Sequence, residues 1–285
     1  MKTIILSDVN SKWESVIPYG LRVGRAFESE VDVVYIIDKR MQQGTYNAQS
    51  DSQSIAPGGN TLSQDEIIQR EWNRANLLLD KLLSSEASRL NFPLKVNRVV
   101  KENGIVDELQ SFANDNPEYI FIASAEPDNY IFESKNDIIS VLNETRITTL
   151  LVPPRLKYKD IEHVLLPVDL NEKEDTGVLR DLKFFFERFK PLINAASVTD
   201  QKNYSNAETV GGAWKKTAED YFVDTSIKIN TLEGNNFTDS IIDFAEKNTP
   251  DLIIVQQGVG NFSKENIVSL LNDLKIPVLL YYGKK

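Results

Sequence analysis

Internal repetition is the feature that most constrains the fold of this chain. Three segments of the first half recur in the same order in the second half. The matched segments are 4–8 with 164–169, 112–123 with 244–255, and 147–152 with 276–281. A chain of 285 residues is long enough for two domains of ordinary size. The sequence therefore predicts two copies of one fold.

Each half alternates short apolar runs with segments of helical periodicity. An uninterrupted apolar run such as Leu252–Val255 is typical of a strand buried on both faces of a parallel sheet. We expect strands at 3–8, 31–37, 94–100, 119–124, 148–152, 163–168, 193–198, 225–231, 251–256 and 277–282. The fold class is therefore α/β, with two tandem doubly wound domains that each hold a five-stranded parallel sheet between helices.

The helical segments between these strands show apolar residues at i, i+3, i+4 and i+7. They lie near 16–27, 68–82, 105–113, 178–189 and 267–274, and each is expected as one continuous helix. Pro153 and Pro154 open a charged stretch that separates the halves. We expect domain 1 at 1–153, a linker at 154–160, and domain 2 at 161–285.

Composition excludes several classes of function. Lys and Arg number 32 against 42 Asp and Glu, for a formal net charge of −10, so nucleic acid and anionic membranes are unfavourable partners. The chain has no cysteine, which excludes disulfides and thiolate zinc sites, and its single histidine, His163, cannot build a multi-histidine metal site. We expect no catalytic residues and no metal. A surface histidine is the expectation for His163.

No targeting or membrane-spanning segment is visible in the sequence. The N-terminal apolar run, Ile4–Leu6, is too short for a signal-peptide core, and no apolar stretch approaches the roughly 20 residues that span a bilayer. We expect a cytoplasmic protein.

Ligands of doubly wound sheets bind beyond the carboxyl ends of the strands, where the strand order reverses. In this chain Asp8 and Asp169 follow the first strand of each half, and the segments 124–128 and 256–260 follow the fourth. The candidate binding residues at these positions are Asp8, Val168, Asp169, Gln257, Gly258 and Gly260.

Three motifs resemble the universal stress proteins, whose domains have the adenine nucleotide alpha hydrolase-like fold. Val164–Asp169 is similar to their first strand, Asp251–Val255 to their fourth, and Ile276–Leu280 to their fifth. The resemblance covers the whole chain as two fused copies. It implies that the domains pair within the chain through Leu150–Val152 and Val278–Tyr281, which would cover two apolar edge strands. A homodimer of such chains stays open.

Nucleotide-binding members of that family carry Gly-x2-Gly-x9-Gly-Ser/Thr after the fourth strand, where bare backbone amides cradle phosphate. The first copy departs from this pattern, because no glycine occurs between Gly104 and Gly177. In the second copy neither Gly258 nor Gly260 starts a register that fits, and the phosphate-binding arm looks deleted. By resemblance, Asp169 would contact a ribose hydroxyl or an adenine amino group.

The leading functional hypothesis is a non-catalytic regulatory module of universal-stress type with degenerate nucleotide sites and no resident cofactor. One alternative is a switch or weak ATPase that binds ATP or AMP in the domain 2 crevice at Asp169 and Gly258. Another is a scaffold that binds an unknown protein partner through residues 42–64, which are rich in Gln, Ser, Asn and Gly. A disordered connection is the simpler explanation of that segment.

Overall fold

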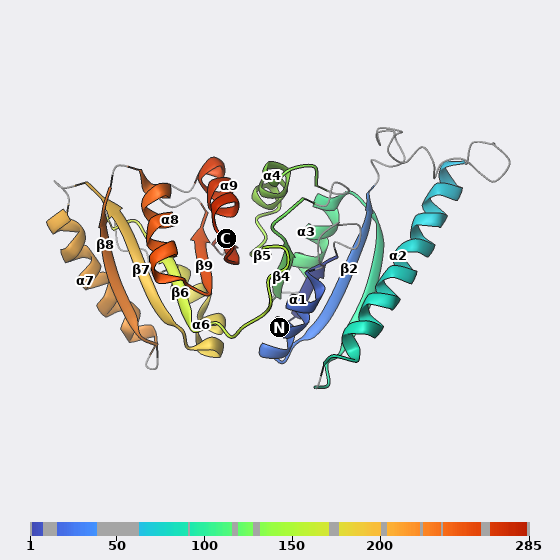
Figure 1. Cartoon of the computed structure of the whole chain (residues 1–285), viewed down its shortest axis with the longest axis horizontal. Coiled ribbons are helices and arrows are strands. Elements are labelled where there is room, and N and C mark those ends of the chain that lie inside the picture. The colour runs from blue at the N-terminus through green and yellow to red at the C-terminus, as the bar shows by residue number, and fades with distance from the viewer. Residues whose placement is uncertain are drawn as a thin grey trace. The chain divides into compact units, whose positions relative to one another are not determined.

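The computed structural model describes residues 2–7, 16–38, 63–90, 92–115, 119–127, 132–170, 177–200, 204–222, 225–234, 236–257 and 263–283. The chain divides into two compact units, residues 1–134 and 135–285. Figure 1 shows strands flanked by helices in each unit. No helix among the described residues is long and apolar enough to cross a membrane.

Unit 1 is a parallel sheet in the strand order β3-β2-β1-β4. Its elements are β1 (Lys2–Leu6), α1 (Ile17–Ala26), β2 (Glu30–Asp38), α2 (Gln64–Ala87), β3 (Val96–Asn103), α3 (Ile105–Asp115) and β4 (Tyr119–Ser124). The chain moves from β1 to β3 in one direction and returns to β4. Right-handed crossovers therefore place α1 and α2 on one face and α3 on the other.

Unit 2 is a sheet in the order β5-β10-β9-β6-β7-β8, parallel except for β5, which runs antiparallel to β10. Its elements are α4 (Lys135–Thr145), β5 (Thr149–Val152), β6 (His163–Pro167), α5 (Gly177–Asp181), α6 (Lys183–Phe189), β7 (Leu192–Thr199), α7 (Tyr204–Tyr221), β8 (Ile227–Glu233), α8 (Phe237–Asn248), β9 (Leu252–Gln256), α9 (Lys264–Asp273) and β10 (Val278–Tyr281). The central strands β10, β9 and β6 are mostly apolar and buried. Leu252–Val255 of β9 has no exposed surface, as expected of a strand covered on both faces.

The doubly wound α/β fold class is confirmed. All ten expected strands are present, with ends shifted by at most three residues. Continuous apolar runs located the central strands, because a strand buried between two helical layers has no polar face. The edge strands β3 and β8 include polar and partly exposed residues.

The helix expected at 178–189 is two helices, so that expectation was wrong. Leu182 lies between α5 and α6 with φ −96° and ψ 17°, outside the helical region, and Lys190 ends α6 in the left-handed region. Leu182 itself is 2% exposed, and Phe185 and Phe186 are both fully buried. The three side chains keep the i, i+3, i+4 spacing of one helix face, so the apolar pattern continues across the break and does not reveal it.

Helix α4 and strand β5 belong to unit 2 although they precede the linker in sequence. Strand β5 pairs with β10 through Leu151 opposite Val278 and Leu150 opposite Leu279. The expected domains, 1–153 and 161–285, follow the sequence repeat, and that division stays a prediction.

Helices α4 and α9 pack through reciprocal lysine contacts. Lys135, the first residue of α4, donates from Nζ to the Leu271 carbonyl oxygen at 3.0 Å. Lys264, the first residue of α9, donates from Nζ to Ser140 Oγ at 2.6 Å. The repeat found at 147–152 and 276–281 extends back through these helices, which our sequence analysis missed: 135–143 and 264–272 agree at Lys, Ile, Ser, Leu and Asn in the same spacing.

The segment before β6 is held against unit 2 by Asp251. Its Oδ2 accepts the backbone N–H groups of Glu162 at 3.0 Å and His163 at 2.9 Å, and its Oδ1 pairs with Lys159. Burial raises the pKa of Asp251, but the Lys159 ammonium and the two amides outweigh burial and hold the pKa below its ordinary value. Asp251 therefore fixes the start of β6 in its ionised form.

Replacing Asp251 by Asn makes a pH-dependent difference in stability. The depressed pKa means that Asp251 contributes its full stabilisation above the unfolded pKa of about 3.9 and loses it as pH falls through the folded pKa. We expect Asp251→Asn to lower the free energy of unfolding by about 1–3 kcal/mol at pH 7. The difference in this free energy between variant and wild type should become smaller below about pH 4. Urea denaturation across pH measures this. Asp243→Asn, at an exposed position of α8, is the control; a gap that is constant with pH contradicts the assignment.

Replacing glycine by alanine is expected to change stability in opposite directions at two helical positions. A Cβ on Gly24 of α1 would lie 2.4 Å from Val31 Cγ2, whereas a Cβ on Gly212 of α7 meets nothing within 4 Å. Gly24→Ala should destabilise the protein by about 1–3 kcal/mol through overpacking. Gly212→Ala should stabilise it by about 0.5–1 kcal/mol through helix propensity. Thermal unfolding distinguishes them, and equal shifts of the two would refute the close α1–β2 approach.

Candidate functional site

Strand order reverses between β6 and β9 in unit 2. The chain leaves β6 toward β7 on one side, while β9 pairs with β6 on the other through Val164 opposite Leu252. The connections on the two sides cross opposite faces of the sheet, so their loops separate at the carboxyl ends of β6 and β9. This places the residues after β6 and after β9 at one candidate site, as the sequence indicated.

Asp169 lies at this point on a backbone that β7 fixes from both sides. Val168 N–H donates to the Ala196 carbonyl oxygen at 2.9 Å, and Leu170 N–H donates to Ser197 Oγ at 3.2 Å. Leu170 is 1% exposed, whereas Val168 and Asp169 are partly exposed. A carboxylate between two anchored neighbours is pre-organised, which suits it to accept hydrogen bonds from a ligand.

Helix α7 supports the same strand end from one face of the sheet. A Cβ on Gly211 would lie 2.9 Å from Ile229 Cγ2 and 3.1 Å from Leu170 Cδ1. The helix can approach this closely because position 211 has no side chain. Ser197 and Gly211 are supporting residues that sequence reasoning missed.

Gln257 follows β9 and supplies an enclosed amide. Its backbone N–H donates to the Tyr281 carbonyl oxygen at 2.8 Å. Its side-chain Nε2 is inaccessible to solvent and has no hydrogen-bond partner in the described part of the chain. Such a donor is unusual in a native structure and marks a place where a water or a ligand atom would be stabilised.

The remaining candidates fall outside the described residues. Asp8, Gly258 and Gly260 are among them, and so are residues 42–62 of the expected scaffold segment. Of that segment only Ser63 and Gln64 are described, as the N-cap and first residue of α2. The expectations for these positions stay predictions.

Helix α9 begins next to this site, and its own side chains occupy its N-terminus. Ser263 is the N-cap and its Oγ accepts the Asn266 N–H at 3.3 Å. The Glu265 carboxylate accepts hydrogen bonds from its own backbone N–H and from the Ser263 hydroxyl. Both hydrogen bonds lower the pKa of Glu265, the backbone one more strongly. An ionised carboxylate therefore sits where a phosphate would otherwise find free amides.

In unit 1 the reversal falls between β1 and β4. Ser7 follows β1, is 2% exposed, and donates its backbone N–H to the Val34 carbonyl oxygen at 2.7 Å. Its Oγ has no hydrogen-bond partner among the residues that the structure describes. After β4, Glu126 N–H donates to Ser124 Oγ at 3.2 Å, which turns the chain back and leaves a carboxylate near this edge.

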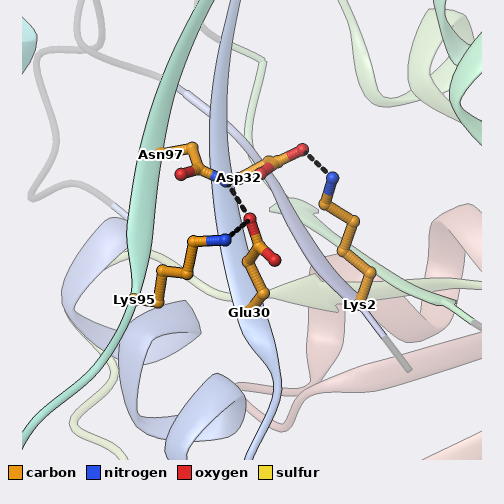
Figure 2. Close-up of polar contacts among 5 residues, drawn as sticks. All are labelled: Lys2, Glu30, Asp32, Lys95 and Asn97. Atoms are coloured by element: carbon orange, nitrogen blue, oxygen red, sulfur yellow. Dashed lines mark hydrogen bonds and ion pairs between the residues drawn. The ribbon is translucent and has the colours of Figure 1, made fainter.

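A denser polar cluster lies at the opposite, amino edge of unit 1 (Figure 2). Lys2 Nζ is 2.6 Å from Asp32 Oδ2, and Asn97 Nδ2 donates to Asp32 Oδ1 at 2.8 Å. Asn97 also donates to Glu30, which pairs with Lys95 at 3.0 Å; Asn97 first and then Lys95 lower the pKa of Glu30. Asp32 is 4% exposed and both of its oxygens are paired, so this network fixes the sheet and offers no open position to a ligand.

The polar residues at these edges do not assemble a metal site. Within the described residues, no three Asp, Glu or His side chains gather closely enough to hold a metal ion. His163, the first residue of β6, is exposed at the amino end of that strand. His163 is the first of the five residues of β6, so four steps of about 3.3 Å, roughly 13 Å, separate it from the carboxyl end of the strand.

Structure comparison finds proteins similar to this chain, whereas the two sequence comparisons do not. No protein-family model matches the chain, and no curated protein matches it in sequence. A universal stress protein from Archaeoglobus fulgidus DSM 4304 aligns with 98% of this chain and 97% of its own length, with 11% identity and a TM-score of 0.67. A putative universal stress protein from Pseudomonas aeruginosa UCBPP-PA14 aligns with 99% of this chain and 93% of its own, with 11% identity and a TM-score of 0.59.

A third structure, a protein of unknown function from Pseudomonas aeruginosa PAO1, covers 99% of this chain and 92% of its own, with 11% identity and a TM-score of 0.56. Identity at this level carries the fold and no activity. The alignments span the whole chain, as two fused copies require. The chain thus has the fold of the universal stress proteins, in a tandem arrangement.

Proposed function

We propose that this chain is a cytoplasmic, non-catalytic binding and regulatory protein of universal-stress type that does not hold a nucleoside triphosphate. The observation that supports this most directly is the N-terminus of α9. Ser263 accepts the Asn266 N–H and the Glu265 carboxylate accepts its own N–H, so two of the amides that a phosphate would use are already engaged, and a carboxylate lies beside them.

The length of the β9–α9 connection supports the same conclusion. Only residues 257–263 separate the two elements. The nine-residue spacer of the family's glycine pattern alone is longer than this connection. In unit 1 residues 125–134 join β4 to α4, and they contain no glycine and include Glu126. The unit 1 connection therefore has no glycine to line a cradle and carries a carboxylate. The β9–α9 connection is too short for the family's spacing, and Glu265 follows it in the first turn of α9.

Of the described residues that directly follow β6 and β9, which are 168–170 and Gln257, only Asp169 has an acidic or basic side chain. This supports a role without chemistry. General acid–base catalysis needs a titratable group within hydrogen-bond reach of the reacting atom. His163 lies at the wrong end of β6 for this. Binding is the activity that the remaining geometry supports.

Calorimetric titration with ATP, ADP and AMP in the presence of Mg²⁺ tests the proposal. We expect no saturable binding in the micromolar range, because the α9 amides are capped and Glu265 repels phosphate. Micromolar binding of ATP would overturn it.

A nucleotide-binding switch in unit 2 is the second candidate, and the enclosed Gln257 Nε2 beside the partly exposed Asp169 favours it. Asp169→Ala separates the two. If nucleotide binds and this variant abolishes the binding, the crevice is a nucleotide site. If nucleotide binds equally to wild type and variant, it binds elsewhere and the crevice assignment is wrong.

Removing the cap of α9 tests the central observation. Ser263→Ala should lower stability by about 1 kcal/mol, since it leaves the Asn266 N–H unsatisfied. Ser269→Ala, on the same helix beyond the first turn, should change stability by less than about 0.5 kcal/mol. Chemical denaturation measures both. Equal effects would mean that Ser263 does not cap the helix.

A further inference from the structure

The junction between β3 and α3 combines an amide side chain with an unhindered backbone nitrogen. Asn103 ends β3 and Gly104 follows it, and they form the single Asn-Gly pair of the sequence. In such a pair the glycine nitrogen can approach the side-chain amide carbon of asparagine, because glycine has no side chain to obstruct it and leaves the backbone free to rotate. Both residues are partly exposed to solvent. The junction is therefore a candidate site of covalent modification.

The position of Gly104 on the sheet leaves its backbone nitrogen without a partner. β3 is the outermost strand beside β2, and the Val31 N–H of β2 donates to the Lys95 carbonyl oxygen at 2.9 Å. The backbone groups of a strand point alternately to its two sides, so the odd-numbered residues of β3 bond to β2 and the even-numbered residues face the open edge. Gly104 continues this alternation, and its N–H makes no hydrogen bond within the described part of the chain.

The side chain of Asn103 forms a hydrogen bond across the junction. Its Nδ2 donates to Glu108 Oε1 at 2.9 Å, and Glu108 lies in the first turn of α3. The Glu108 N–H donates in turn to the Gly104 carbonyl oxygen at 3.1 Å. The side-chain amide of Asn103 thus connects the end of β3 to α3. Glu108 needs a donor at position 103, because an ionised carboxylate only accepts hydrogen bonds.

We propose that Asn103 is a site of spontaneous deamidation that breaks this connection between β3 and α3. The backbone nitrogen of Gly104 loses its proton to solvent and attacks Cγ of Asn103. The N–Cγ bond forms, the Cγ–Nδ2 bond breaks, and Nδ2 takes up a proton and leaves as ammonia. Water then opens the cyclic imide at either carbonyl, which gives aspartate or isoaspartate. The net reaction consumes water, releases ammonia and changes no oxidation state.

Both products place a new negative charge in an acidic environment. Glu102, Asp107 and Glu108 are neighbours of the junction in the sequence. A carboxylate at position 103 cannot donate to Glu108, so the hydrogen bond is lost and two carboxylates face each other. The isoaspartate product also adds a methylene group to the main chain where it enters α3. This proposal goes beyond the proposed function and stands whether or not either crevice binds a ligand.

Peptide mapping of the folded full chain by mass spectrometry tests the reaction. The protein is incubated in mildly alkaline buffer at physiological temperature, and the conversion of each asparagine is followed over time. We expect Asn103 to convert faster than Asn73 and Asn272. Both of these are exposed, but a bulkier residue follows each of them. Chromatography should resolve an aspartate and an isoaspartate product at position 103.

Gly104→Ala supplies the matched variant. A Cβ at this position meets only the Asp107 side chain, at 3.3 Å, and the Gly104 backbone lies outside the left-handed region, so the fold should accept alanine. The methyl group should slow the conversion of Asn103 by roughly tenfold or more, since it hinders the approach of the nitrogen. Gly212→Ala, where a Cβ meets nothing within 4 Å, should leave this rate unchanged. Circular dichroism verifies that each variant is folded.

Charge variants test the consequence for the junction. Asn103→Asp reproduces one product and should lower the midpoint of thermal unfolding by about 2–4 °C. Adding Glu108→Gln should restore most of this loss, because the glutamine amide can donate to the new carboxylate. Glu108→Gln alone should change the midpoint by less than about 1 °C, since glutamine still accepts from Asn103.

The proposal fails on any of three results. The first is conversion of Asn103 no faster than that of Asn73 in the folded chain. The second is an equal rate at Asn103 in wild type and Gly104→Ala. The third is a midpoint of Asn103→Asp that the added Glu108→Gln does not raise, which would mean that position 103 does not act on α3 through Glu108.

Discussion

Burial of β10 is the constraint on which the architecture of unit 2 depends. Val278, Leu279 and Leu280 have no exposed surface, and Tyr281 is 4% exposed. A strand this apolar needs cover on both faces and pairing along both edges. β9 covers one edge in parallel and β5 covers the other in antiparallel orientation. The need to satisfy β10 therefore explains why α4 and β5 join the second unit, although the sequence repeat groups them with the first half.

The order of the elements could be predicted because burial leaves a pattern in a single segment. Apolar runs identified the central strands, and Leu252–Val255 is the plainest example. Features that join distant segments leave no such pattern. Asp32 accepts a hydrogen bond from Asn97, which is 65 positions away in the sequence. Neither segment by itself indicates the strand register that brings the two residues together. The break at Leu182 was missed for a related reason, since Val178, Leu182, Phe185 and Phe189 keep helical spacing across the bend.

The same distinction applies to the candidate site. Asp169 and Gln257 were identified because topology places the ends of the first and fourth strands at the reversal of a doubly wound sheet. Their surroundings were not accessible in this way. Ser197 and Gly211, which hold Leu170 and thereby Asp169, come from β7 and α7, and only the folded chain shows that they meet. The cap at Ser263 is different, because a serine just before an apolar periodic segment is a local signal that could have been used.

Capping and anion binding compete for the same amides. The first-turn N–H groups of a helix can be satisfied by the chain's own side chains or by an external anion, and one group cannot fully serve both. In α9 Ser263 Oγ accepts the Asn266 N–H and the Glu265 carboxylate accepts its own N–H, which stabilises the helix and engages two of these amides. The Asn266 amide therefore cannot fully serve an external anion while Ser263 caps the helix, and an anion that used it would have to displace the cap and lose the stability that the cap provides.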